Sequence, residues 1–210
     1  MGLIKNEYIE QDCIIGLWEI NETFDTLYSM VSLNDEEKDT LYSFKNDARQ
    51  LEWLSVRALL NKLTQKESRI VYNEERKPFL HDNSYNISIS HSHKLTSVLL
   101  SQTKKVGIDL EFMSHRINKI SHKFINCNEH ITNVKELEKL HLYIHWCAKE
   151  ALYKICDKKN INFKDNLTIK PFDIRQEDCI VGIHHDADIH NEFAMKYHIH
   201  DNYVIVYCAK

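Results

Sequence analysis

The chain has 210 residues, 43% of them hydrophobic, and a formal net charge of −4 at pH 7. This length fits one large domain or two lobes of about 100 residues each, and the hydrophobic fraction is sufficient for a folded core. A net charge this small gives no indication of general binding to nucleic acid or to a membrane surface. The 6 cysteines are scattered without a Cys-x-x-Cys pair, so reduced thiols in a cytoplasmic protein are expected.

The hydropathy pattern contains no targeting or membrane signal. The first residues lack a basic segment followed by an apolar run, so we expect no secretory signal. No apolar stretch approaches the about 20 residues that cross a bilayer, so we expect no membrane-spanning segment. With 4 glycines and 2 prolines, the chain offers no long flexible linker.

The first half of the chain predicts a strand, then helices, then short strands. Residues 13–20 have the composition of a strand. Asn34 precedes three acidic residues, which is typical of a helix start. Helical composition continues to about residue 66 with a break near Asn46, and a short strand follows at residues 70–72.

Two further strands are predicted near the middle of the chain. Residues 95–101 and 106–112 are joined by a short turn, so we expect them to form an antiparallel hairpin. In the second of these strands apolar and other residues alternate, which places Asp109 and Glu111 on one face, about 7 Å apart. Two carboxylates that close repel unless a cation or a proton lies between them, and carboxylates are ligands that Mg²⁺ accepts. Taken alone, the pair also fits an exposed strand face with two ordinary acids.

Residues 133–158 predict one long helix, because no glycine or proline interrupts them. The apolar residues that recur at helical spacing and define a buried stripe are Leu137, Leu140, Ile144, Ala148, Ala151 and Ile155. A rotation of about 100° per residue puts four others on the opposite side, namely Trp146, Lys149, Glu150 and Lys154. A solvated face explains the charges, but a large aromatic residue among them suggests that this face also meets another lobe or a ligand.

The remaining segments complete an alternation of helix and antiparallel strands in each half. Residues 113–132 have no regular pattern and are expected to supply surface for a partner. The strands predicted after the long helix cover residues 167–169, 180–183, 193–200 and 203–208, with a turn at residues 201–202.

Two motifs together resemble the signature of the 4′-phosphopantetheinyl transferases. Residues 107–111 read Gly-Ile-Asp-Leu-Glu, and residues 146–154 read Trp-Cys-Ala-Lys-Glu-Ala-Leu-Tyr-Lys. Every position of the family patterns G-[IV]-D-[LI]-E and W-x-x-K-E-[AS]-x-x-K is filled, at the family's spacing. The chain resembles in particular the larger, two-lobed class that modifies carrier domains.

The resemblance implies an α+β fold of two similar, pseudo-symmetric lobes, each a long helix packed on a small antiparallel sheet. The lobes are expected at residues 1–105 and 106–210, with the metal site in the second lobe and coenzyme A in the cleft between them. Because one chain would then contain both halves of the cleft, a monomer is expected.

The resemblance also implies an activity, the transfer of 4′-phosphopantetheine from coenzyme A to a serine of an apo acyl or peptidyl carrier protein. Adenosine 3′,5′-bisphosphate would be released. Asp109, Glu111 and Glu150 would hold Mg²⁺, or Mn²⁺ in its place, against the pyrophosphate. Glu150 would take the serine proton and Lys154 would neutralise developing charge. Lys149 would pair with a carboxylate or assist proton transfer.

Three segments of the first half resemble coenzyme A-binding blocks of the family. Residues 49–57 resemble the helical pattern R-x-x-E-[WF]-L-x-x-R, in which Arg57 is preferred to Arg49 as a ligand. Residues 76–78 read Arg-Lys-Pro where the family usually has G-K-P, and arginine resists backbone angles that glycine reaches. Residues 86–92 resemble N-[IL]-S-H-S, with Ser88 where asparagine is usual. The implied coenzyme A ligands are Arg49, Arg57, Arg76, Lys77, Pro78, Ser90, His91 and Lys154.

Other interpretations stay open. A metal-dependent phosphoesterase would use the same three acids on coenzyme A or a nucleotide, with water in place of serine, and a non-catalytic module would only bind coenzyme A or a carrier protein. His141 and His145 have the spacing of a zinc pair on a helix, but no third ligand and no H-E-x-x-H pattern accompany them. The histidines of the last third are expected to be structural or solvent-facing.

Overall fold

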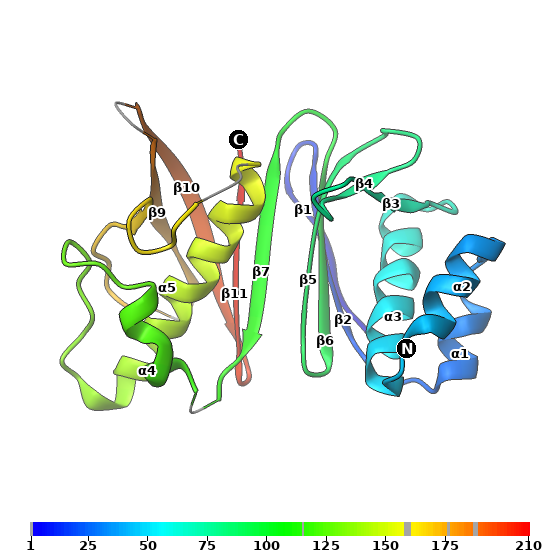
Figure 1. The fold of residues 1–210 in the computed structure, drawn as a ribbon, viewed down its shortest axis with the longest axis horizontal. Coiled ribbons are helices and arrows are strands. Elements are labelled where there is room, and N and C mark those ends of the chain that lie inside the picture. Colours follow the sequence, from blue (N-terminus) through cyan, green and yellow to red (C-terminus); the bar gives the residue numbers. More distant parts are fainter. Residues whose placement is uncertain (1, 115, 158–160, 176, 187–188) are drawn as a thin grey trace. The chain divides into compact units, whose positions relative to one another are not determined.

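The structure is a computed structural model that describes residues 2–114, 116–157, 161–175, 177–186 and 189–210. The chain forms two compact units, residues 1–104 and 105–210 (Figure 1), a division one residue away from the expected lobes. Each unit contains helices and an antiparallel sheet, so the predicted α+β fold is confirmed. The pseudo-symmetry of the lobes stays a prediction.

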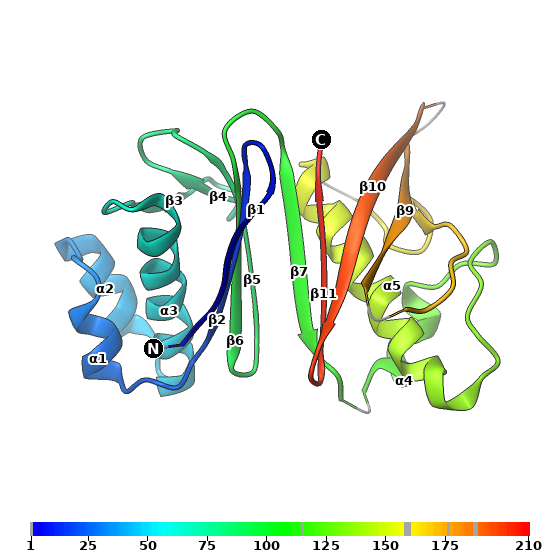
Figure 2. The ribbon, with the colours of Figure 1, turned by 180° about the vertical axis from the view of Figure 1, so that it is seen from behind.

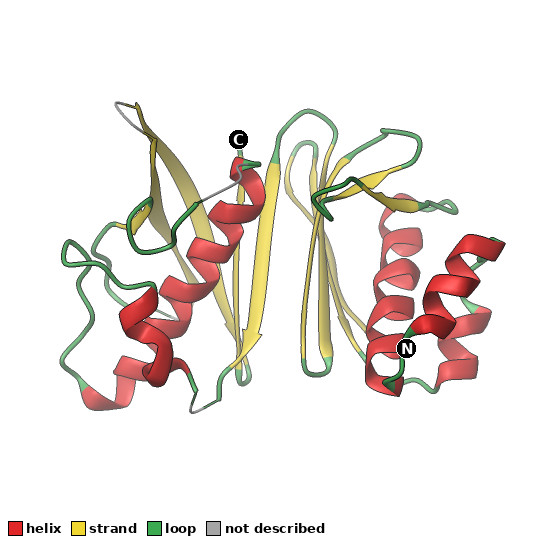
Figure 3. Cartoon of the chain, viewed as in Figure 1, coloured by secondary structure: helices red, strands yellow, loops and turns green. Residues whose placement is uncertain are grey.

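The first unit is built on a four-stranded antiparallel sheet in the order β1-β2-β6-β5, together with a two-stranded sheet of β3 and β4. Three helices accompany the strands, shown in red in Figure 3. The elements are, in chain order, β1 (Leu3–Glu10), β2 (Cys13–Glu19), α1 (Phe24–Ser29), α2 (Asp35–Ser43), α3 (Asp47–Thr64), β3 (Ile70–Tyr72), β4 (Pro78–Leu80), β5 (Asn86–Ser92) and β6 (Leu95–Ser101).

Local sequence explains where α2 and α3 begin. The Asn34 side chain accepts a hydrogen bond from the N–H of Glu37, and the Glu37 side chain accepts one from the N–H of Asn34, which is a capping box. The side chain of Asn46 caps α3 in turn, so the predicted break between two helices is confirmed. From this start α3 buries Leu54, Leu59 and other apolar residues in the core of the unit.

The expected hairpin of residues 95–101 and 106–112 is wrong. β6 pairs with β2 and β5 in the first unit, whereas β7 (Val106–Phe112) pairs with β11 (Tyr203–Ala209) in the second. A short turn permits a hairpin but does not require one, because pairing also depends on which apolar face each strand must bury. The strand β1 was not predicted, since most of its residues are exposed or only partly buried and show no apolar alternation.

The second unit is a five-stranded antiparallel sheet in the order β7-β11-β10-β9-β8, with β7 at its edge. The helix α5 lies across one face of this sheet, as Figure 1 shows from the front and Figure 2 from behind. Its elements are β7, α4 (Ile117–Ile120), the short 3₁₀ helix η1 (Ser121–Lys123), α5 (Lys135–Cys156), β8 (Leu167–Ile169), β9 (Glu177–Asp186), β10 (Ile189–His200) and β11.

The helix α5 is the long helix that the sequence predicts, with 22 residues. Ile144, Ala148 and Ala151 are buried, as the apolar stripe predicts. Leu137 is 38% exposed, so the buried stripe begins later than expected. In the part of the chain that is described, no helix is long and apolar enough to span a membrane.

Two buried histidines of α5 belong to this core. The Nδ1 atom of His141 accepts a hydrogen bond from the N–H of Thr132 at 3.0 Å, and Nδ1 of His145 lies 2.9 Å from the carbonyl oxygen of His141. The two rings pack edge to face and both contact the ring of Phe172. Burial lowers the pKa of His141 to about 4 and the pKa of His145 to about 3. Both rings are therefore neutral in the folded chain at pH 7.

We expect the fold to lose stability in mild acid because of these histidines. The unfolded chain protonates them near pH 6.5 and the folded chain does not, so stability is complete above that pH and falls as the pH drops toward 4. For His145 the expected loss at pH 5 is about 2 kcal/mol. Urea unfolding at pH 7.5 and pH 5 measures it. His145→Phe should reduce the difference between the two pH values, whereas His81→Phe at an exposed position should not. An equal pH dependence in all three proteins would contradict the assignment.

Candidate active site

The face of β7 that carries the two acids is the face on which α5 packs. Gly107, Asp109 and Glu111 alternate along β7 with residues of the other face. A side chain at Gly107 would place its Cβ 2.2 Å from the carbonyl oxygen of Ala151 on α5. Only glycine allows this close approach, and it brings the acids of β7 beside the charged residues of α5.

Lys154 of α5 forms an ion pair with Asp109 of β7. Its Nζ lies 2.8 Å from Oδ1 of Asp109, and it also donates to the carbonyl oxygen of Ile108 at 2.8 Å. The Asp109 side chain is 7% exposed and the Lys154 side chain 27%, so the pair is sheltered but open on the lysine side. The structure therefore joins one residue from each of the two motifs.

The charges of Asp109 and Lys154 also act on the carboxyl of Glu150. Burial raises the pKa of its carboxyl to about 7, with a further increase from the charge of Asp109 and a smaller one from Glu111, while Lys154 opposes the shift. Both predicted acids of β7 thus act on the carboxyl of Glu150. Cys147, also on α5, faces Asp109, and burial raises the pKa of its thiol so far that it stays protonated. Cys147 is also closed to solvent, so it has the character of a buried core thiol and not of a reactive one.

The donor chemistry of this cluster suits a hard divalent cation. Three carboxylates offer oxygen ligands, and Asp109 and Glu111 both add to the rise that burial causes in the pKa of Glu150, although Lys154 opposes it. Within the described residues, no group of three or more His, Cys, Asp and Glu side chains is already arranged to hold a metal ion. The metal site at Asp109, Glu111 and Glu150 therefore stays a prediction that the charges support.

Lys149 lies apart from this cluster. Its side chain is fully buried and pairs with Glu129 at 2.7 Å, which is the pairing with a carboxylate that the sequence leaves open. Burial lowers the pKa of Lys149. The large aromatic residue of the same helix, Trp146, contacts the rings of Phe124 and Phe163, so what it meets is the protein's own loops. The geometry favours a structural role for Lys149 over the catalytic one.

In the first unit, Arg49 and His91 come together. The Nη1 atom of Arg49 lies 2.5 Å from Nε2 of His91, and Oε2 of Glu52 contacts both residues, at 3.0 Å from Arg49 and 3.4 Å from His91. The Arg49 and His91 side chains are 41% and 36% exposed. Ser90, the residue before His91, is buried in β5. An arginine and a histidine at an accessible position can receive a phosphate group.

Arg57 is buried and does not resemble a ligand-binding residue. Its side chain is 6% exposed, pairs with Glu37 at 3.3 Å and lies with its guanidinium 3.1 Å from the ring centroid of Trp53. Burial lowers the pKa of Arg57 to about 10, which leaves it charged at pH 7. The contacts therefore favour Arg49 over Arg57 as a coenzyme A ligand, and both assignments stay predictions. The helical spacing alone does not show which arginine faces the core.

Arg76 and Lys77 lie in the turn between β3 and β4, and Pro78 is the first residue of β4. Arg76 has a φ of 62°, in the left-handed region that glycine reaches without strain. The turn is stabilised by the Asn73 side chain, which accepts hydrogen bonds from the N–H groups of Glu75 and Lys77. Arginine thus takes the backbone conformation expected of the family's glycine, at a strain of about 1 kcal/mol. Arg76 is exposed.

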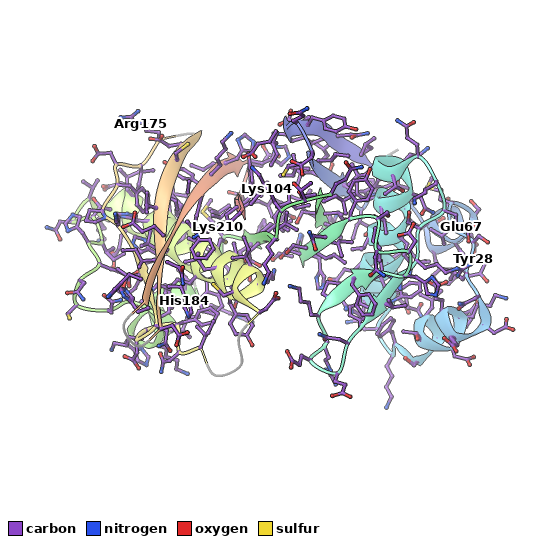
Figure 4. All side chains as sticks on the ribbon, turned by 90° about the horizontal axis from the view of Figure 1, so that it is seen from above. Tyr28, Glu67, Lys104, Arg175, His184 and Lys210 are labelled. Carbon is purple, nitrogen blue, oxygen red and sulfur yellow. The ribbon has the colours of Figure 1, made fainter. Side chains whose placement is uncertain are left out.

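The C-terminal histidines follow the structural expectation where they are described. His184 is 3% exposed on β9, and Figure 4 labels it among the side chains of the second unit. His185 and His190 face each other across β9 and β10, with their Nδ1 atoms 2.7 Å apart.

Comparisons with known proteins show the family of the chain. Residues 105–208 match the model of the 4′-phosphopantetheinyl transferase superfamily, which is nearly all of the second unit. A Haemophilus influenzae protein named "Putative 4'-phosphopantetheinyl transferase" is 30% identical over 165 residues. That alignment covers 67% of the chain and 66% of the relative, just under two thirds of the relative's length. The chain belongs to the 4′-phosphopantetheinyl transferase superfamily.

Proposed function

We propose that the chain is a transferase of the larger, two-lobed class that moves 4′-phosphopantetheine from coenzyme A to a serine of an apo acyl or peptidyl carrier protein. The observation that carries the proposal is the ion pair of Lys154 and Asp109 beside Glu150. It joins the two motifs by which the chain resembles the family. Binding of coenzyme A between the two lobes and action as a monomer stay predictions.

In this proposal the residues of the second unit have separate roles in metal binding, charge neutralisation and proton transfer. Asp109, Glu111 and Glu150 would hold Mg²⁺ or Mn²⁺, which neutralises charge on the pyrophosphate when bound. Lys154 supplies a second positive charge where the phosphoanhydride breaks. Glu150 accepts the proton of the serine hydroxyl. The serine oxygen bonds to the pantetheine-side phosphorus, the bond from that phosphorus to the bridging oxygen breaks, and adenosine 3′,5′-bisphosphate leaves.

Intact-mass spectrometry of an apo carrier protein tests the reaction. The carrier is incubated with the chain, coenzyme A and Mg²⁺, with and without EDTA. A gain of one phosphopantetheine on the carrier, lost with EDTA, is the expected result. Coenzyme A hydrolysed while the carrier stays unmodified would replace the proposal with a metal-dependent phosphoesterase. Coenzyme A bound but intact, with no carrier of several types modified, would favour a binding module.

The two arginines of the first unit are expected to differ when each is replaced. Arg49→Ala should weaken coenzyme A binding about tenfold, because a charge-assisted hydrogen bond to phosphate is lost. Arg57→Ala should instead lower the free energy of unfolding by about 2 kcal/mol, because the packing on Trp53 and one of the two ion pairs of Glu37 are lost, while the pair of Glu37 with Arg69 remains. Calorimetric titration with coenzyme A and thermal unfolding of both variants measure the two effects. An Arg57→Ala protein with unchanged stability and weakened coenzyme A binding would restore Arg57 as the ligand.

A further inference from the structure

The pair of Lys149 and Glu129 is closed to solvent and uses every donor of the lysine. Nζ of Lys149 lies 2.7 Å from Oε2 of Glu129, and both side chains are 0% exposed. The same ammonium donates to the carbonyl oxygen of Phe163 at 2.9 Å and to the carbonyl oxygen of Phe124. An ammonium has three N–H donors. No donor of Lys149 is therefore left for a substrate.

Glu129 is equally occupied by the backbone around it. Its Oε1 accepts the N–H of Ile169 in β8 at 2.9 Å, and its Oε2 accepts the N–H of Asn126 at 2.9 Å. The buried pair thus connects α5 with three other segments, namely the loop of residues 124–129, the loop around Phe163 and the end of β8. These segments have little other regular structure, so the hydrogen bonds of the pair hold their backbones in place against α5.

Trp146 holds the same two phenylalanines by their rings. The ring centroids of Trp146 and Phe124 are 5.1 Å apart, and those of Trp146 and Phe163 are 5.6 Å apart. Lys149 binds the carbonyl groups of both phenylalanines while Trp146 packs on their rings. The first part of the helix motif, from Trp146 to Lys149, therefore binds the loops that contain Phe124 and Phe163. The following residue, Glu150, begins the half that faces β7 together with Lys154.

We propose that Glu129 is a positioning residue, which through Lys149 fixes the turn of α5 that carries Glu150. The inference rests on the proposed function, because it concerns the residue that would accept the serine proton. A buried charge pair requires both partners, since removing one leaves the other uncompensated. Without Glu129, the buried ammonium of Lys149 keeps only two neutral carbonyl acceptors and loses its counter-charge, so we expect the turn of α5 that holds both Lys149 and Glu150 to shift. A misplacement of a catalytic group by about 1 Å reduces the rate of the chemical step strongly.

The test replaces Glu129 and compares kinetics with stability. In Glu129→Gln we expect kcat for carrier modification to fall about 30-fold with an unchanged KM for coenzyme A. Glu129→Asp keeps the carboxylate on a shorter side chain that reaches Lys149 less well, so it should recover only part of the lost rate and stay about fivefold below the wild type. The control is Ile180→Ala, a buried core change on β9 that lowers the melting temperature without touching the pair. All assays run well below the lowest melting temperature of the set.

Each outcome decides the proposal. If Glu129→Gln lowers the melting temperature but keeps the wild-type kcat, as Ile180→Ala should, the pair is only structural and the proposal is overturned. If Glu129→Gln does not fold, the kcat of Glu129→Asp is compared with that of Ile180→Ala in the same way, and a rate no lower than the control's overturns the proposal.

A wild-type chain that modifies no carrier would reject the proposed function but not the positioning role. Amide hydrogen exchange then tests the positioning role of Glu129 without an assay of activity. The amides of residues 124–129 and of the α5 turn around Glu150 should exchange about tenfold faster in Glu129→Gln than in the wild type. In Ile180→Ala the exchange of these amides should rise no more than that of the other core amides, because this substitution lowers only the global stability. Equal protection of these amides in Glu129→Gln and wild type would overturn the proposal without any assay of activity.

Discussion

Replacing Glu150 with glutamine is expected to reduce carrier modification about 1,000-fold while making the folded chain more stable at pH 8. The rate falls because an amide neither accepts the serine proton nor binds a divalent cation as a carboxylate does. Stability rises because burial and Asp109 raise the pKa of Glu150 to about 7 from an ordinary value of 4.5. Above pH 7 the folded chain therefore carries a charge that its surroundings oppose, and the substitution removes that charge. The gain is expected to be about 1–2 kcal/mol at pH 8 and small at pH 5.

The measurements are the initial rate of carrier modification by intact mass and the thermal unfolding at both pH values. Glu136→Gln is a matched control, since it makes the same chemical change in the exposed first turn of the same helix. This control should retain both rate and stability. A Glu150→Gln protein with full activity would remove Glu150 from the reaction. A loss of rate accompanied by a loss of helical content would mean that the fold, not the chemistry, had been damaged.

Replacing Gly107 with alanine is expected to separate β7 from α5 and to impair stability and activity together. The added Cβ would lie 2.2 Å from the carbonyl oxygen of Ala151. Because the obstacle is helix backbone, the helix must move as a whole. We expect a loss of about 3 kcal/mol in the free energy of unfolding. A shift of α5 also moves Glu150 and Lys154 away from Asp109, so transfer should fall about 100-fold in molecules that remain folded.

Gly182→Ala is the matched control for this change. Gly182 also lies in a strand under α5, but its added Cβ would meet the ends of flexible side chains, Leu152 at 2.7 Å and Met195 at 2.8 Å. These ends can rotate away, so a loss of about 1 kcal/mol and nearly normal activity are expected. Urea unfolding and the mass assay compare the two variants. Equal effects at both glycines would show that the approach of α5 to β7 is not special to the site.

Periodic and local signals were enough to predict most of the elements. The helix α5 follows from a long run without glycine or proline, and the start of α2 follows from the capping pattern at Asn34. The juxtaposition of the two motifs followed from the resemblance to the family. The structure then places Asp109 beside Lys154, and the pKa of Glu150 responds to both.

What could not be predicted depends on contacts between residues far apart in the chain. The pairing of β7 with β11 depends on residues about one hundred positions later, and no local pattern encodes it. The same is true of Glu129, which lies in a segment without periodicity and becomes informative only once Lys149 is seen to be buried against it. Arg49 and Arg57 occupy one helix, and only the packing of that helix shows that Arg57 faces inward.

The pairing of β7 with β11 also sets the order in which the site can form during synthesis. β7 lies at the edge of its sheet and its neighbour in that sheet is β11, so Asp109 and Glu111 lack a strand partner there until residues 203–209 have left the ribosome. Asp109 and Glu111 are thus synthesised early, but the strand that carries them gains its partner only when β11 has been synthesised. A chain interrupted before β11 would retain both motifs and the helix α5, yet would leave β7 as an unpaired strand open to association with other chains.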